Sequence, residues 1–256
     1  KNVLLAELYG EEPLDAGEVY DEIAPALEVI RPHIADVREI IRRALEDGDL
    51  VLEGAQGTFL DLDYGTYPYV TSSHPVAGGA CLGTGVGPTE IDEVIAVVKA
   101  YTTRVGAGDF PTELEDAIGE RLRERGAEFG TTTGRPRRCG WLDGVALRTA
   151  AELNGTTGIA ITKLDVLDEE ETVRIANAYE IDGERYERMP ENLDLLGEVK
   201  PVYEDMPGWQ TSLCEMTSLE EMPEEARRYI DRMAELADCE IWGVSVGPAR
   251  DQTIIL

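Results

Sequence analysis

The sequence is poor in several residue types, and each shortage excludes a class of protein. Basic residues are outnumbered, because 23 Lys and Arg stand against 52 Asp and Glu, which gives a formal net charge of −29. Such a field repels a phosphate backbone, so no nucleic-acid partner is expected. The acidic residues are spread among plentiful aliphatic ones, which favours a folded, strongly solvated surface over disorder and indicates adaptation to high salt. A surface that steers cationic partners is the alternative explanation.

Cysteine, histidine and long apolar runs are also scarce. The four cysteines are Cys81, Cys139, Cys214 and Cys239. They form no CxxC pair and have no disulfide or metal-cage spacing, so a reducing, cytoplasmic setting is expected. No apolar run approaches the roughly 20 residues that cross a bilayer, and the first residues do not resemble a signal peptide, which predicts a soluble protein without a membrane partner. Of the two histidines, His33 falls in a helical region and His74 in a loop without an evident partner, so neither is assigned to catalysis.

The pattern of apolar residues predicts an α/β fold. Between Glu18 and Leu45 apolar residues recur every three or four positions, which indicates a helical segment with a buried apolar face and an interruption near Pro25 or Pro32. Further along, strands and helices alternate, which predicts a mostly parallel central sheet flanked by helices. Strands are expected within 50–57 and 158–168 and at 101–105, 172–181, 185–189, 241–246 and 252–256, and helices at 92–100, 114–125, 142–153 and 223–237.

A single α/β domain is expected over residues 1–256, which is long enough for a substantial core. Its expected parts are a helical segment at 1–48, a region of strands and loops at 49–170, and a region at 171–256. The last region begins with a small antiparallel hairpin, whose strands are joined by the turn Asp182-Gly183.

Two strand ends carry polar motifs, and such ends are where open parallel sheets bind ligands. In "TKLD", 162–165, Asp165 can accept hydrogen bonds from N1–H and the amino group of guanine, while the stem of Lys163 covers the ring. In "SVGPAR", 245–250, backbone groups of a glycine turn can close over the same base or ribose. Taken alone, each motif is better explained as an ordinary strand end or turn.

An arginine-rich loop lies between these motifs, at 130–138. Its guanidinium groups, on Arg135, Arg137 and Arg138, repel one another unless an anion joins them, and arginine binds carboxylates and phosphates in a bidentate manner. The neighbouring threonines add donors and acceptors, and Gly134 lets the backbone approach a ligand closely. A basic loop paired with the acidic surface is the alternative, but a substrate with carboxylates explains the loop better.

A glutamine between glycines follows the first predicted strand, in "EGAQG" at 53–57. The amide of Gln56 can donate to a carbonyl oxygen that becomes anionic during a reaction, which lowers the barrier when the donor is held in place. A helix cap or a simple loop residue explains Gln56 about equally well.

Six segments together resemble one enzyme family, in both order and spacing. They are "EGAQGTFLDLDYGTYPYVTSS", "TRVGAGDFPTEL", "EFGTTTGRPRRCGWLD", "TKLDVLD", "YEDMPGW" and "SVGPARDQTI". From about Glu53 to the C-terminus the chain resembles adenylosuccinate synthetase, and the combination of motifs is highly specific. The resemblance implies a P-loop NTPase-like synthetase fold and a GTP-dependent ligase that joins inosine monophosphate (IMP) and L-aspartate into adenylosuccinate, releasing GDP and phosphate. It also implies magnesium (Mg2+) as cofactor, GTP as co-substrate, and a homodimer.

The resemblance also assigns site residues. Those matching the IMP contacts are Gln56, Thr71, Val105, Gly106 and Arg135. Those matching the aspartate-binding loop are Thr131, Thr132, Thr133, Gly134, Arg135, Pro136 and Arg137. Those matching the GTP contacts are Arg137, Lys163, Leu164, Asp165, Ser245, Val246 and Gly247. Gln56 is expected near the 6-oxygen of IMP, which is phosphorylated in the reaction.

One part of the family pattern has no counterpart in the sequence. No glycine-rich phosphate loop of the form GxxxxGK[ST] occurs, and the family's aspartate base, magnesium ligand and histidine acid are not found either. The chain is therefore expected to be the C-terminal portion of such an enzyme, to hold no metal ligand of its own and to be inactive alone. The alternative is a noncatalytic module that binds guanine or purine nucleotides, or regulates another protein.

Overall fold

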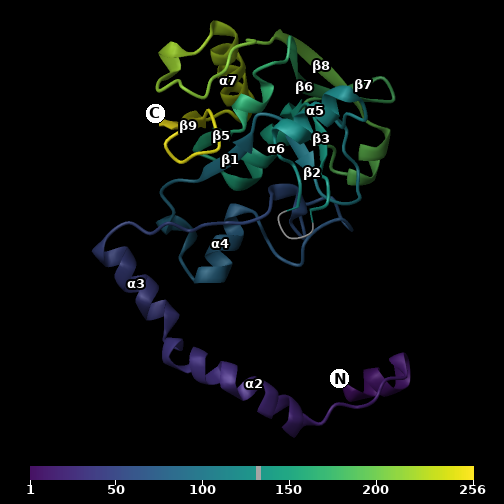
Figure 1. The fold of residues 1–256 in the computed structure, drawn as a ribbon, viewed down its shortest axis with the longest axis vertical. Helices are drawn as coiled ribbons and strands as arrows, with labels where there is room; N and C mark the ends of the chain where they lie inside the picture. The colour runs from purple at the N-terminus through teal and green to yellow at the C-terminus, as the bar shows by residue number, and fades with distance from the viewer. Residues whose placement is uncertain (131–133) are drawn as a thin grey trace. The chain divides into compact units, whose positions relative to one another are not determined.

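The computed structural model describes residues 1–130 and 134–256. The chain forms two compact units, Lys1–Val51 and Leu52–Leu256 (Figure 1). None of the helices in these described ranges is both long and apolar enough to cross a membrane.

The smaller unit contains the predicted helical segment. Its main helices are α2, Ala16–Ile30, and α3, Val37–Asp47, and each is capped by an aspartate, Asp15 and Asp36, whose side chain accepts two backbone N–H groups. They follow α1, Asn2–Leu4, and a wider π-helical turn, Leu5–Tyr9. The predicted interruption is confirmed at Pro32, within the 3-10 turn Arg31–His33, whereas Pro25 lies inside α2.

The expectation that the apolar stripe of this segment is buried is wrong for the chain as it stands. Ile23, Ile34 and Ile40 are 48%, 75% and 56% exposed, and neither α2 nor α3 has a buried residue. An amphipathic helix buries its apolar stripe only against another element. The sequence pattern gives the stripe but not the element that covers it.

The larger unit is built on the expected central sheet, with strand order β1-β5-β9-β10. The strands are β1, Ile95–Lys99, β5, Gly158–Thr162, β9, Glu240–Ser245, and β10, Thr253–Ile255. The first three run parallel, and β10 runs antiparallel to β9. The mostly parallel sheet with flanking helices is therefore confirmed.

The helices of this unit are α4, Ala77–Thr84, α5, Ala117–Arg125, α6, Gly144–Asn154, and α7, Glu224–Ala237. The core contains fully buried side chains from the sheet and from α7, among them Ile159, Ile161 and Tyr229. The Tyr229 hydroxyl donates to the Ala100 carbonyl oxygen (2.6 Å), which joins α7 to the end of β1. Short 3-10 turns lie at Thr58–Leu60, Pro88–Glu90, Leu164–Leu167, Leu193–Glu198 and Leu219–Glu221.

Two smaller sheets complete the unit. In one, β4, Leu142–Asp143, runs parallel to β6, Thr172–Ile181, which pairs antiparallel with both β7, Glu184–Tyr186, and β8, Lys200–Pro207. The predicted hairpin is thus confirmed. In the other, β2, Thr102–Arg104, pairs antiparallel with β3, Arg138–Gly140.

Two predicted elements are wrong. Residues 92–100 hold strand β1 rather than a helix, because Ile95, Val97 and Val98 are β-branched and β5 supplies a parallel partner along the whole strand. Residues 50–57 form no strand, because a strand needs a hydrogen-bonding neighbour and no described segment pairs with them. The pattern also missed α4, whose sequence AGGACLGT is rich in glycine and shows no clear helical period.

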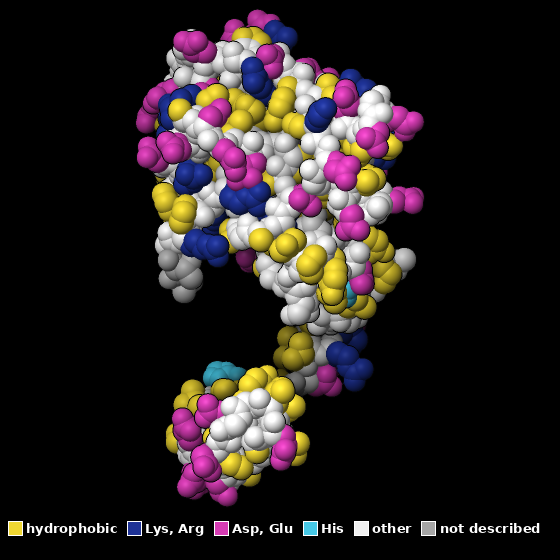
Figure 2. Space-filling model, turned by 90° about the vertical axis from the view of Figure 1, so that its right-hand side faces the viewer, with side chains coloured by type: hydrophobic (Ala, Val, Ile, Leu, Met, Phe, Trp, Pro, Cys, Tyr) yellow, Lys and Arg dark blue, Asp and Glu magenta, His cyan; other side chains and the backbone are white. Residues whose placement is uncertain are grey.

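The acidic excess is distributed over the surface of the larger unit. Figure 2 shows carboxylate side chains scattered over one face and interleaved with lysine and arginine, rather than gathered in a single patch. This arrangement agrees with a generally solvated acidic surface.

Candidate functional site

The carboxyl ends of the parallel strands bring candidate residues to one edge of the sheet. Lys99 is the last residue of β1 and pairs with Thr162, the last residue of β5, so Lys163 follows directly beside it. Ser245 ends β9, the parallel neighbour of β5 on its other side. Ligands of open parallel sheets bind at this edge, which makes it the candidate site.

The "TKLD" motif turns sharply as β5 ends. Lys163 adopts the left-handed conformation (φ 63°), and its ammonium donates to the Gly126 carbonyl oxygen (2.8 Å). Leu164 is fully buried beneath the turn. Burial raises the pKa of the Asp165 carboxyl above its ordinary value, against the attraction of Lys163. Asp165 is thus a half-buried carboxylate beside a fixed ammonium.

The second strand-end motif forms a closed turn. The Ser245 hydroxyl donates to the Gly247 carbonyl oxygen (2.9 Å), and the Val246 N–H donates to the Gln252 carbonyl oxygen (2.9 Å). Val246 is fully buried. The backbone of 245–247 is therefore fixed at the end of β9, beside the end of β5.

The arginine loop differs from its sequence explanation in one respect. Arg137 pairs with Glu128 (Nη1 to Oε2, 2.6 Å), and Arg138 pairs with Glu113 (Nε to Oε1, 2.7 Å). Arg137 and Arg138 therefore need no external anion to offset their repulsion, because the chain supplies a carboxylate to each. The expectation from the sequence is wrong on this point. Only the guanidinium N–H groups that these ion pairs do not engage can bind a ligand.

Arg137 has such a donor. Its Nε is buried and has no hydrogen-bond partner within the described residues. Its backbone is fixed on both sides, since its N–H donates to the Glu128 carbonyl oxygen (2.9 Å) and its own carbonyl oxygen accepts from Arg123 Nε (2.8 Å). A buried, unpaired N–H group on a fixed arginine is well suited to an anionic ligand.

Three described residues of the loop, 134–136, are exposed. Gly134 adopts φ 62°, which favours glycine, and its N–H donates to the Gly130 carbonyl oxygen (2.7 Å). Arg135 and Pro136 are exposed, and the Arg135 carbonyl oxygen accepts from the Gly130 N–H (2.8 Å). The predicted residues Thr131, Thr132 and Thr133 lie outside the described residues.

The predicted IMP residues Gln56 and Thr71 are brought together, although 15 positions separate them. Gln56 Nε2 donates to Thr71 Oγ1 (3.1 Å), and Gln56 Oε1 accepts from Ser73 Oγ (3.3 Å). Gln56 has a left-handed backbone (φ 71°), which is uncommon for a residue other than glycine. Ser73 was missed by the sequence reasoning, although it lies in the quoted "YVTSS".

Two other predicted IMP residues, Val105 and Gly106, follow β2. Val105 is 59% exposed, and Gly106 has φ 78°. Arg104, directly before them, donates to Thr66 Oγ1 (2.9 Å) and to the Ala107 carbonyl oxygen (3.0 Å). Arg104 thus ties the turn after β2 to the loop that contains Thr71.

A buried carboxylate that the sequence reasoning did not assign lies at the centre of this region. Glu128 is fully buried, and its Oε1 accepts from Lys99 Nζ (2.8 Å) and from the Tyr101 hydroxyl (2.7 Å). Burial opposes its ionisation, but the hydrogen bonds from Lys99 and Tyr101 outweigh it and hold the pKa of Glu128 below its ordinary value. Glu128 is therefore an ionised carboxylate that connects the C-terminal end of β1 to the arginine loop.

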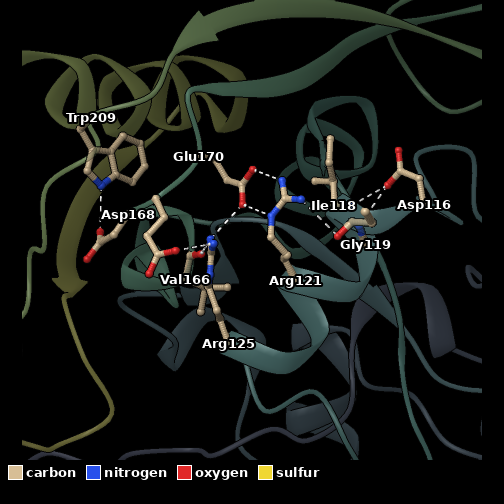
Figure 3. A network of polar contacts seen from close by, with 11 residues as sticks. Asp116, Ile118, Gly119, Arg121, Arg125, Val166, Asp168, Glu170 and Trp209 are labelled. Carbon is tan, nitrogen blue, oxygen red and sulfur yellow. Dashed lines mark hydrogen bonds and ion pairs between the residues drawn. The ribbon is translucent and has the colours of Figure 1, made fainter.

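Helix α5 is joined by ion pairs to the segment that follows β5 (Figure 3). Arg121 and Arg125 both pair with Glu170 (2.7 and 2.8 Å), and Arg125 also reaches the Val166 carbonyl oxygen (3.5 Å). Nearby, Asp168 accepts from Trp209 Nε1 (2.8 Å). Charged contacts therefore hold both flanks of the turn Leu164–Leu167.

The expectation that His74 has no partner is wrong. His74 Nδ1 lies 3.3 Å from Oδ1 of Asp61, which is fully buried and also accepts from the backbone N–H groups of Asp63 and Tyr64. The pair holds the loop in place, which gives His74 a structural role. His33 lies in the 3-10 turn after α2 and is exposed.

The described residues contain no evident set of magnesium ligands. No group of three or more His, Cys, Asp or Glu side chains in 1–130 and 134–256 is placed to hold a metal ion.

A mostly parallel sheet with polar residues gathered at its carboxyl edge defines the class of α/β proteins that bind ligands there, and comparisons identify the family. The family model described as adenylosuccinate synthetase matches residues 1–254, and the chain belongs to that family. It is 56% identical to adenylosuccinate synthetase of Moorella thermoacetica and 53% identical to that of Geotalea daltonii, each over the whole chain.

A solved structure gives the same result for the fold. The structure of fully ligated adenylosuccinate synthetase from Plasmodium falciparum superposes with a TM-score of 0.92 at 36% identity, covering 98% of this chain and 60% of that chain. This chain likewise spans 60% of the length of the two bacterial relatives. The fold and family are therefore established, while the activity of a whole protein is a separate question.

Proposed function

We propose that this chain supplies the IMP, aspartate and guanine sites of a GTP-dependent ligase that joins IMP and L-aspartate into adenylosuccinate, with release of GDP and phosphate. Family membership supports the reaction. The single observation that carries the proposal is the buried Arg137 Nε, a donor without a partner among the described residues, on an arginine whose Nη1 is already held by Glu128. Such an edge suits the carboxylate of aspartate or a phosphate oxygen.

The guanine site lies at the ends of β5 and β9. Asp165 accepts from N1–H and the amino group of the base, since an ionised carboxylate offers acceptors to both donors. Lys163, fixed by the Gly126 carbonyl oxygen, covers the ring with its stem, and the closed turn Ser245–Gly247 bounds the pocket. Adenine has no donor at N1, so a nucleotide carrying it leaves Asp165 short of a partner.

The purine of IMP lies at Gln56 and Thr71. A side-chain amide nitrogen has two N–H groups, and the hydrogen bond to Thr71 engages one. The second is the donor that we assign to the 6-oxygen, where negative charge develops as the oxygen is phosphorylated. The hydrogen bonds to Thr71 and Ser73 fix the amide before the substrate arrives.

The residues for proton transfer, for the γ-phosphate and for magnesium are not proposed within this chain. Magnesium supplies charge neutralisation at the transferring phosphoryl group when it is bound. The chain's own residues bind and orient the purine, the amino acid and the guanine base. A homodimer is proposed on the family resemblance, and sedimentation velocity of the protein tests it.

The experiment is single-turnover formation of adenylosuccinate from GTP, IMP, aspartate and Mg2+ in high potassium chloride. It compares this chain with a protein that carries it at the full length of its relatives. We expect turnover by the longer protein and not by this chain alone. The variant Arg137→Ala should raise the aspartate requirement by about ten- to hundredfold, because a charged hydrogen bond is lost. If the longer protein makes no adenylosuccinate while the chain still binds guanine nucleotide, the chain is a binding module and the proposal is wrong.

A further inference from the structure

Glu128 has two carboxylate oxygens with separate partners. Oε1 accepts from Lys99 Nζ and the Tyr101 hydroxyl, which belong to the end of β1 and the residues after it. Oε2 accepts from Arg137 Nη1 at 2.6 Å. One oxygen therefore fixes the carboxylate to the central sheet, and the other fixes the arginine to the carboxylate.

We propose that Glu128 is a positioning residue for the ligase reaction, holding the Arg137 guanidinium by Nη1 so that its remaining N–H groups stay oriented toward the aspartate substrate. The inference rests on the proposed function, which it deepens at the aspartate site. Glu128 touches no substrate and acts through Arg137.

The surroundings leave Arg137 few other ways to be held. Its side chain is 28% exposed, that of Glu128 is 1% exposed, and the two residues are also joined by a backbone hydrogen bond (2.9 Å). A charge-assisted hydrogen bond at this depth fixes orientation as well as position, because water competes weakly for either partner. Without this hydrogen bond the Arg137 guanidinium could rotate, and its N–H groups would face the substrate only part of the time.

The same segment also fixes the guanine side of the site. Gly126, two residues before Glu128, accepts from Lys163 Nζ, and Ala127 between them has a left-handed backbone (φ 47°). The Gly126 carbonyl oxygen therefore holds Lys163 of the predicted guanine site, and the Glu128 carboxylate holds Arg137 of the predicted aspartate site. A displacement of Glu128 would therefore move both cations, but of the two only Arg137 is hydrogen-bonded to the Glu128 side chain.

A matched control exists in the same loop. Glu113 forms an ion pair with Arg138, the next residue after Arg137, and neither is among the residues that the family resemblance assigns to aspartate. Glu128→Gln and Glu113→Gln each remove the carboxylate partner of one arginine and keep the side-chain size, although Glu128→Gln also removes the charge that faces Lys99. Their comparison separates an effect on Arg137 from a general effect of breaking an ion pair in this loop.

The experiment measures steady-state adenylosuccinate formation by the protein at the full length of its relatives. We expect Glu128→Gln to raise the KM for aspartate about tenfold or more and to leave the KM for IMP within about twofold, because Gln56 and Thr71 do not contact Glu128. Glu113→Gln should change both constants by no more than about twofold. In a protein that already carries Arg137→Ala, adding Glu128→Gln should raise the KM for aspartate no further.

Equal effects of the two glutamine variants on the aspartate KM, or additive effects in the double variant, would overturn the inference. If Glu128→Gln does not fold, Glu128→Asp against Glu113→Asp decides the question, since aspartate keeps the charge but withdraws it from the arginine by about one bond length. A parent protein that forms no adenylosuccinate refutes the proposed function instead. An active parent with an unshifted aspartate KM in the Glu128 variants refutes only the role of Glu128.

Discussion

The buried aspartate at the start of α6 makes stability depend on pH in a direction opposite to that of most paired carboxylates. Asp143 is 5% exposed, its Oδ1 accepts from the Ala146 N–H (2.9 Å), and its Oδ2 accepts from the Tyr179 hydroxyl (2.6 Å). Burial raises the pKa of Asp143 to about 6, although both hydrogen bonds favour the ionised form. The folded protein therefore holds this proton more tightly than the unfolded chain does.

The size of the effect follows from the two pKa values. A folded pKa of about 6 against 3.8 for the unfolded chain corresponds to about 3 kcal/mol, at 1.36 kcal/mol per pH unit. Because the folded pKa is the higher one, this stability is present below about pH 4 and is lost as the pH rises to about 6. Asp143→Asn removes the titration and keeps an acceptor for the Ala146 N–H.

The assay is urea unfolding of both proteins between pH 4 and pH 7, followed by tryptophan fluorescence. The free energy of unfolding of Asp143→Asn, minus that of the parent, should rise by roughly 2.5 kcal/mol across this range, because the unfolded parent is already partly ionised at pH 4. Other carboxylates, such as Glu128 with its lowered pKa, titrate in both proteins and cancel in the difference. Asp231→Asn, an exposed aspartate on α7, is the control and should give a flat difference. A flat difference for Asp143→Asn as well would refute the reasoning.

Two further predictions test the guanine side of the site and its support. Asp165→Asn should lower the preference for GTP over ATP, as the ratio of kcat/KM, by about ten- to hundredfold, because an amide cannot accept from both guanine donors; an unchanged ratio would exclude Asp165 as the base-reading group. Glu170→Gln should cost about 2 kcal/mol and lower Tm by several degrees, because Arg121 and Arg125 lose a buried partner. Glu152→Gln, which breaks an exposed pair, should move Tm little, and equal shifts would contradict the argument.

The sequence predicted the elements whose pattern fits one structure only. Strand β9 and helix α7 are found within a residue or two of their predicted bounds, because a short apolar run and a 3.6-residue period leave little choice. Strand β5 starts where it was predicted but ends at Thr162, because the residues after it form the 3-10 turn Leu164–Leu167. Residues 92–100 were misjudged because their run of apolar residues suits a helix as well as a strand. Pairing with β5, more than 60 positions away, decides between them, and such a contact is absent from a local pattern.

The candidate site divides in the same way. Gln56, Thr71 and Lys163 were predicted because they belong to motifs that resemble the family, and Gln56 and Thr71 do lie in contact. Glu128 was missed although it opens the quoted segment "EFGTTTGRPRRCGWLD", because it is one of 52 acidic residues and nothing local sets it apart. Its role depends on Lys99, 29 positions earlier, and on a burial that only the fold creates.

The left-handed backbone of three residues in this region limits how the protein can be made more stable. Gln56, Ala127 and Lys163 all have positive φ without being glycine, at a cost of roughly 1 kcal/mol each. Glycine would relieve that strain at each position and, at Gln56 and Lys163, would delete the side chain proposed to meet a substrate. Engineering for heat resistance by the usual glycine rule would thus trade activity for stability at these two positions, while Ala127 could be changed without that loss.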